Sequence, residues 1–99
     1  MTEAKLLFVD DDVDERTIIK ELFEEQHFND ALYFNDGLSV LEHLNQIEED
    51  AHLPKTIVTD ISMPVMSGLE LLKILKATPR FKDIKVVVLS TGSKQRYRE

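Results

Sequence analysis

The sequence predicts an α/β protein with a doubly wound parallel sheet, on two observations. Short, uninterrupted apolar runs recur along the chain, and segments with apolar residues at helical spacing lie between them. Uninterrupted apolar strands indicate burial on both faces, as in parallel sheets, because strands with one wet face alternate apolar and polar residues. The predicted order is strand, helix, strand, helix, strand, helix, strand, with right-handed crossovers.

The first half of the chain contains two predicted strands and two predicted helices. Lys5 to Val9 is a continuous apolar run and is predicted as a buried strand. A helix is expected from Val13 to about Glu25, with Asp12 or Asp14 as its cap. Ala31 to Phe34 is predicted as the second strand. Asp36-Gly37 then opens a helix whose apolar residues are Leu38, Val40, Leu41, Leu44 and Ile47.

The second half repeats the pattern. Asp50 to Pro54 is expected to be a loop, and Thr56 to Asp60 a third buried strand. An apolar helix follows from Leu69 to about Lys76, and Pro79 ends it. Ile84 to Leu89 is the most strand-like run of the chain.

Composition favours one soluble domain over residues 1–99. The chain has 99 residues, of which 42% are hydrophobic and 31% charged, and it has no cysteine, which excludes disulfides and thiolate metal sites. A net charge of −7 argues against direct binding of nucleic acid. The sequence has neither a signal peptide nor an apolar run long enough to cross a bilayer, so a cytoplasmic protein without membrane contact is expected.

Acidic and hydroxyl side chains follow three of the predicted strands. Asp10 and Asp11 end the first strand, Asp60 ends the third, and Ser90 and Thr91 follow the fourth. Ligands of open parallel sheets bind beyond the carboxyl ends of the strands. Gathered carboxylates favour a hard divalent cation such as Mg²⁺, and a carboxylate beside that cation can act as a nucleophile toward phosphorus. The sequence therefore predicts a magnesium site formed by the carboxylates of Asp10, Asp11 and Asp60.

Taken singly, each of these residues has a simpler explanation. The acidic run from Asp10 to Asp14 suits the positive end of a helix dipole, and Asp60 alone could be a loop residue. Ser90 or Thr91 alone would be structural. Only their joint placement at the ends of three strands favours a site.

Three segments resemble the response-regulator receiver family of two-component signalling. They are Leu6-Leu7-Phe8-Val9-Asp10-Asp11, then Asp60-Ile61-Ser62-Met63-Pro64-Val65-Met66-Ser67-Gly68, and Val86-Val87-Val88-Leu89-Ser90-Thr91. The second is the most specific, and the resemblance runs from about Lys5 to Thr91. It implies a flavodoxin-like receiver fold with strand order 2-1-3-4.

The resemblance also implies the cofactor and its ligands. Asp60 is expected to be the phosphoacceptor and a ligand of Mg²⁺. Asp11 is expected to bind the ion directly, and Asp10 to act closely or through water. The backbone carbonyl of Ser62 completes the implied protein ligands.

Further roles follow from the same resemblance. Ser90 is expected to be the switch hydroxyl that turns toward the phosphoryl group, with Met63, Pro64, Gly68 and Thr91 supporting the loops. The implied phosphoryl donor is a histidine kinase or a phosphotransfer protein, and the protein would be a signalling switch rather than an enzyme.

The sequence departs from the family at its carboxyl end. The fifth strand with its lysine and the last helix have no counterpart before Glu99, so the receiver is expected to be incomplete. Ile84 to Leu89 would then be an edge strand beside an exposed apolar face, which favours self-association.

Two other functions stay open at this point. A degenerate receiver could serve only as a dimerisation or interaction module. Alternatively, Phe8 to Val13 fits the motif of haloacid-dehalogenase-like phosphatases, with Asp10 as nucleophile and Asp12 as acid. That second alternative leaves the segment from Asp60 to Gly68 unexplained.

Overall fold

A computed structural model describes residues 4–90 and confirms the predicted fold class. Its centre is a four-stranded parallel sheet with strand order β2-β1-β3-β4. The elements in chain order are β1 (Leu6–Val9), α1 (Val13–Glu25), β2 (Ala31–Phe34), α2 (Gly37–Gln46), a 3₁₀ turn (Asp50–His52), β3 (Thr56–Asp60), α3 (Gly68–Ala77) and β4 (Lys85–Leu89).

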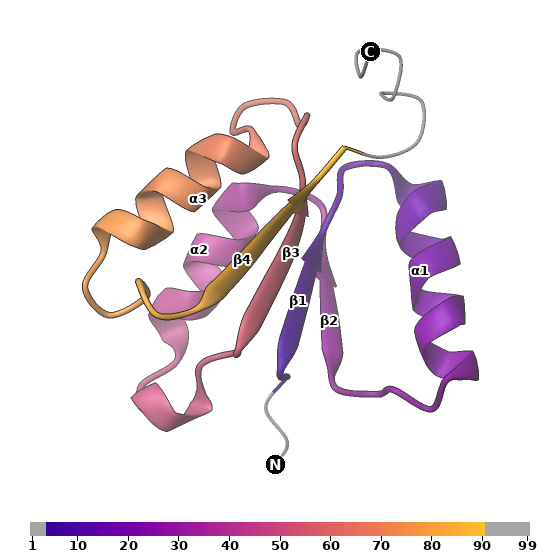
Figure 1. Cartoon of the computed structure of the whole chain (residues 1–99), viewed down its shortest axis with the longest axis horizontal. Helices are drawn as coiled ribbons and strands as arrows, with labels where there is room; N and C mark the ends of the chain where they lie inside the picture. Colours follow the sequence, from indigo (N-terminus) through magenta and orange to yellow (C-terminus); the bar gives the residue numbers. More distant parts are fainter. Residues whose placement is uncertain (1–3, 91–99) are drawn as a thin grey trace.

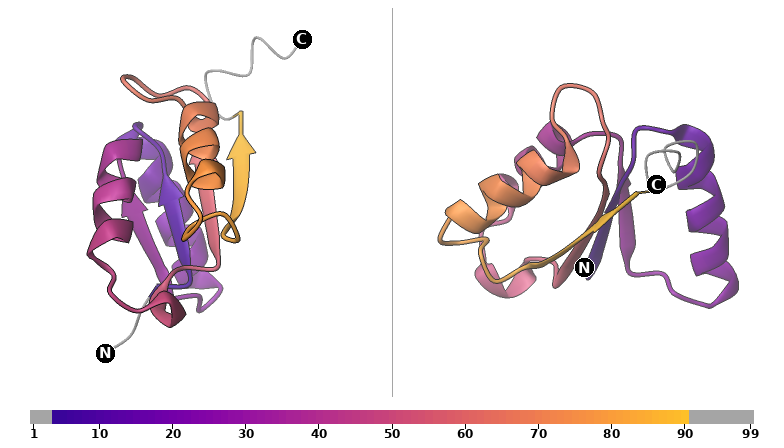
Figure 2. Two further views of the ribbon diagram at one scale, coloured as in Figure 1. Left: turned by 90° about the vertical axis from the view of Figure 1, so that its left-hand side faces the viewer. Right: turned by 45° about the horizontal axis from the view of Figure 1, so that its top comes forward.

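The helices lie on both faces of the sheet, as the uninterrupted apolar strands predict. In Figure 1, α2 and α3 cover one face and α1 covers the other, and Figure 2 shows the same three layers from two further directions. The main core lies between the sheet and the α2/α3 pair. Its fully buried members are Leu7, Val9, Val40, Leu44, Ile57, Leu71 and Leu75.

The layer that contains α1 is less tightly packed. No residue of α1 is buried, and Val13, Ile18 and Leu22 are 59%, 56% and 49% exposed. Phe8 supplies the main buried side chain of this face, at 4% exposure. A pocket of about 160 Å³ lies here, lined by Phe8, Asp10, Glu15, Ile18, Ile19 and Leu89.

Each helix begins at a side-chain cap that its sequence provides. Of the two residues expected to cap α1, Asp12 does so, accepting hydrogen bonds from the backbone N–H groups of Asp14 and Glu15 at 2.9 and 3.3 Å. Asp36 caps α2 through Ser39 N–H. These caps set the direction in which the chain leaves the sheet, and α1 leaves directly beside the ends of β1 and β3.

Within the part of the chain that the structure describes, none of the helices has the length and apolar character needed to span a bilayer.

Candidate phosphoryl-acceptor and cation site

The strand register brings the carboxyl ends of β1, β3 and β4 to one edge of the sheet. Val9 lies opposite Thr59, and Asp60 opposite Leu89. The loops that follow β1 and β3 meet at this edge, which is the upper one in Figure 1. Asp10 and Asp60 are therefore brought together by the pairing of their strands, as the sequence predicts.

Asp10 is buried and is held by the start of α1. Its side chain is 0% exposed, and Oδ1 accepts a hydrogen bond from Asp12 N–H at 2.9 Å. Arg16 Nη1 donates to the backbone carbonyl of Asp10 at 2.7 Å. The other carboxylate oxygen, Oδ2, is buried without a hydrogen-bond partner in the described chain. A buried carboxylate oxygen without a hydrogen-bond partner raises the free energy of the folded state unless a proton or a cation compensates its charge.

Asp60 ends β3 and is 1% exposed. Its backbone carbonyl accepts from Thr59 Oγ1 at 3.1 Å. Gly68 lies so close that a Cβ atom there would approach Asp60 O to 2.3 Å, which no real side chain tolerates. Gly68 N–H donates to Ile61 O at 2.9 Å. The glycine thus lets α3 start directly against the backbone of Asp60.

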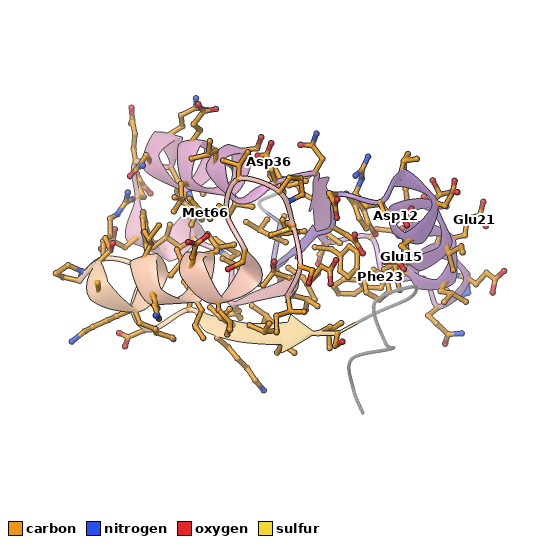
Figure 3. All side chains as sticks on the ribbon, turned by 90° about the horizontal axis from the view of Figure 1, so that it is seen from above. Asp12, Glu15, Glu21, Phe23, Asp36 and Met66 are labelled. Atoms are coloured by element: carbon orange, nitrogen blue, oxygen red, sulfur yellow. The ribbon has the colours of Figure 1, made fainter. Side chains whose placement is uncertain are left out.

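A third acidic residue, Glu15, belongs to the same cluster. One carboxylate oxygen from each of Asp10, Glu15 and Asp60 lies within 4.8 Å of the other two. Figure 3 looks onto this edge from above and shows Glu15 on the side of α1 that faces the sheet. The sequence pattern alone does not place Glu15 beside Asp10 and Asp60. The signal that could have found it is its place in the first turn of α1, because helical side chains lean toward the helix N-terminus.

The acidic neighbours of Asp10 shift its pKa. Burial, the neighbouring Glu15 carboxyl and the charge of Asp60 raise the pKa of Asp10 to about 7, against the lowering effect of the Asp12 N–H bond. Each raising cause disfavours the charged form. Near neutral pH the three neighbouring acidic groups therefore favour the binding of a positively charged ion.

Asp11 and Ser62 lie beside this cluster on the solvent side. Asp11 is exposed and is not one of the three clustered carboxylates. Both residues line an open pocket of about 450 Å³, together with Ile61, Met63, Pro64 and Ser67. The structure thus places Asp11 and Ser62 in one open pocket that the loops after β1 and β3 line.

The loop after Asp60 is compact and partly strained. Met63 is 9% exposed, and its sulfur lies 3.9 Å from Thr59 Oγ1. Met66 N–H donates to Pro64 O at 2.7 Å, which closes a γ-turn with Val65 at φ 70°. Positive φ at a β-branched residue is strained. Ser67 and Glu70 then form a capping box that starts α3.

Ser90 follows β4 at the same edge and is exposed. Ile61 N–H donates to Leu89 O at 2.7 Å, which ties the end of β4 to the loop after Asp60. Thr91, the other predicted hydroxyl residue, lies outside the described residues.

The donor set fits a hard divalent cation. Mg²⁺ prefers oxygen ligands and typically takes one or two carboxylates with water. The cluster offers carboxylates from two strand ends and a helix, and Asp10 Oδ2 is a buried oxygen that needs a positive partner. The arrangement can therefore hold a cation beside Asp60.

Comparison with known proteins identifies the family. The profile of the response regulator receiver domain matches residues 6–99. Chemotaxis protein CheY1 of Helicobacter pylori is 36% identical over 87 residues, which cover 88% of this chain and 67% of that protein. Chemotaxis protein CheY-3 of Vibrio cholerae is 34% identical over 91 residues, with 92% and 66% covered. The chain thus spans about two thirds of the length of these relatives.

Structural comparison agrees at the level of the fold. The structure of the chemotaxis response regulator CheY4 of Vibrio cholerae superposes with a TM-score of 0.73 at 24% identity, covering 96% of this chain and 74% of that one. A buried acidic cluster at the strand ends of a flavodoxin-like sheet and the match of nearly the whole chain lead to one conclusion: this chain belongs to the response regulator receiver domain family.

Proposed function

We propose that the chain is the phosphoacceptor receiver of a two-component phosphorelay, phosphorylated on Asp60 in a Mg²⁺-dependent reaction. The observation that carries the proposal is the burial of Asp60 at the end of β3, within 4.8 Å of the Asp10 and Glu15 carboxylates. The donor would be a histidine kinase or a phosphotransfer protein, which is the donor that the family resemblance implies. Meeting such a donor implies a cytoplasmic location.

The nucleophile in this proposal is a carboxylate oxygen of Asp60. It attacks the phosphorus of a phosphohistidine, the P–N bond breaks with its electron pair going to the imidazole, and an acyl phosphate forms on Asp60. The Thr59 hydroxyl and the close approach of Gly68 hold the backbone of Asp60 in place for the attack. Holding the nucleophile close to the phosphorus accounts for much of the rate in such transfers.

The acidic side chains provide the cation site. Asp10 and Asp60, with Asp11 and the Ser62 carbonyl on the solvent side, would hold Mg²⁺. When bound, Mg²⁺ neutralises charge on the phosphoryl oxygens. Without it, the incoming phosphoryl group would meet several carboxylates of its own sign, so we expect no transfer in its absence.

Ser90 would report the modification. Ser90 follows Leu89, which pairs with Asp60, so its hydroxyl would lie at the edge of the sheet that carries Asp60. A hydroxyl at that place can donate to a phosphoryl oxygen and draw the end of β4 toward the site.

The phosphatase alternative is disfavoured by the role of Asp12. A general acid must keep its carboxyl available for the leaving group, whereas Asp12 Oδ1 accepts from two backbone N–H groups at the start of α1.

The test is incubation with acetyl phosphate, with and without Mg²⁺, followed by intact mass. We expect one added phosphoryl group in the wild type with Mg²⁺, none with excess EDTA and none in Asp60→Asn. Asp83→Asn, an exposed aspartate of equal charge beyond the other end of the sheet, is the matched control and should be modified like the wild type. Equal modification of Asp60→Asn, or none in any protein, would overturn the proposal.

A further inference from the structure

Glu15 joins the acidic cluster from a different element than its neighbours. Asp10 follows β1 and Asp60 ends β3, whereas Glu15 lies in the first turn of α1. A cation held among the three oxygens would therefore touch the sheet and the helix at the same time. Figure 3 shows Glu15 on the sheet side of α1 and Glu21 on the opposite, outer side.

A second observation points to a positive ligand at this place. Asp10 is fully buried, and its Oδ2 has no hydrogen-bond partner among residues 4–90. Its other oxygen already accepts from Asp12 N–H at 2.9 Å. A hard cation has the chemistry to satisfy the remaining oxygen, since carboxylates are its preferred ligands.

The helix itself gains little from apolar packing. None of its 13 residues is buried, and the pocket of about 160 Å³ lies between its inner face and the sheet. Ile18 and Leu22 remain about half exposed, at 56% and 49%. Elements with few buried apolar contacts open at low free energy, so any extra tie to the sheet has a large effect on α1.

We propose that Glu15 is a further carboxylate of the cation site and that a bound divalent cation fastens the first turn of α1 to the ends of β1 and β3. This inference rests on the proposed cation site and deepens it. It predicts that cation binding and the local stability of α1 are coupled through Glu15.

The competing explanation is that Glu15 only complements the dipole of α1. Asp14, in the same turn, carries equal charge, and Asp12 already caps the helix. A dipole effect acts at the helix end whether or not Mg²⁺ is present. The two explanations therefore differ in whether the effect of Glu15 depends on the cation.

The experiment is hydrogen exchange of the whole chain with and without Mg²⁺, in the wild type and in Glu15→Gln. Glu21→Gln is the matched control, because it removes the same charge from the outer face of the same helix. In the wild type, Mg²⁺ should slow exchange in α1 more than in α2. Glu15→Gln should lose that excess protection and bind Mg²⁺ about tenfold more weakly by calorimetry, the size expected for one charge about 5 Å from a divalent ion in a wet site.

The outcomes separate the two levels of the proposal. If Glu15→Gln and Glu21→Gln match the wild type both in Mg²⁺ affinity and in α1 protection, the role of Glu15 is overturned while the cation site stands. If the wild type itself binds no Mg²⁺, the proposed cation site fails, and the role of Glu15 fails with it. The inference is supported if Mg²⁺ no longer gives α1 its extra protection from hydrogen exchange in Glu15→Gln but still does so in Glu21→Gln.

Discussion

Asp10 shows how one residue links the site to the stability of the fold. Burial, the neighbouring Glu15 carboxyl and the charge of Asp60 raise its pKa to about 7 from 3.8. The folded-state pKa then lies above that of the unfolded chain. Stability from this group is fully present below pH 3.8 and is lost as the pH rises through about 7.

Replacing Asp10 by Asn should therefore stabilise the metal-free protein at alkaline pH. In EDTA we expect Asp10→Asn to unfold with a free energy about 2 kcal/mol higher than the wild type near pH 8, and with a smaller difference near pH 5. Urea unfolding at the two pH values measures this change. Asp83→Asn is the control and should show no such pH dependence, and an equal effect of Asp10→Asn at both pH values would contradict the assignment.

The proximity of Asp10 and Asp60 could be predicted from the sequence, whereas that of Glu15 could not. Asp10 and Asp60 were predictable, because parallel strands bring their carboxyl ends to one edge. Which of the adjacent Asp10 and Asp11 enters the buried cluster depends on where the chain turns out of the sheet, and local pattern does not encode that. The proximity of Glu15 could not be predicted, because it depends on the angle between α1 and the sheet, which tertiary packing sets.

At the scale of elements, Gly68 connects the site to α3. A side chain at Gly68 would meet the carbonyl oxygen of Asp60 at 2.3 Å, so α3 or the end of β3 would have to move. Gly37 occupies the equivalent first position of α2, but a Cβ there would meet the flexible Met66 side chain, with Sδ at 2.7 Å. The two glycines form a natural pair for comparison.

We expect Gly68→Ala to lower the free energy of unfolding by about 2 kcal/mol or more, and Gly37→Ala by under about 1 kcal/mol, because a thioether can move and a backbone carbonyl cannot. Gly68→Ala should also weaken Mg²⁺ binding, since Asp60 shifts with its carbonyl. Urea unfolding and calorimetry measure the two effects. Equal destabilisation by both alanines would show that the contact with Asp60 is unimportant.

Helices and strands were the most predictable part of the molecule. The predicted bounds of α1 and β2 agree with the structure, because polar caps and turn residues mark them in the sequence. The helix expected from Leu69 begins at Gly68, after the cap at Ser67. The 3₁₀ turn Asp50–His52 lies in a predicted loop and carries no periodicity long enough to reveal it.

For the molecule as a whole, the two faces of the sheet are unequally covered. The α2/α3 face holds the main core, whereas the α1 face leaves Val13, Ile18 and Leu22 half exposed or more. Within residues 4–90, β4 pairs only with β3, so its outer edge is open. Open apolar edges favour pairing with another chain.

We therefore predict that the 99-residue chain self-associates at micromolar concentration. Val87→Lys, a charge on β4 on the face away from the main core, should shift sedimentation velocity toward the monomer, because edge lysines oppose strand pairing. Lys85→Arg keeps the charge of the same strand and serves as the control. A wild type that sediments only as a compact monomer would contradict this prediction.

We propose that the carboxylates at the ends of β1 and β3 hold one divalent cation beside Asp60. Calorimetric titration with Mg²⁺ measures this binding in the wild type, in Asp10→Asn and Asp60→Asn, and in the Asp83→Asn control. We predict binding of one ion, weakened about tenfold or more by Asp10→Asn or Asp60→Asn and unchanged by Asp83→Asn. Mg²⁺ binding that neither Asp10→Asn nor Asp60→Asn weakens, or no binding at all, would contradict the claim.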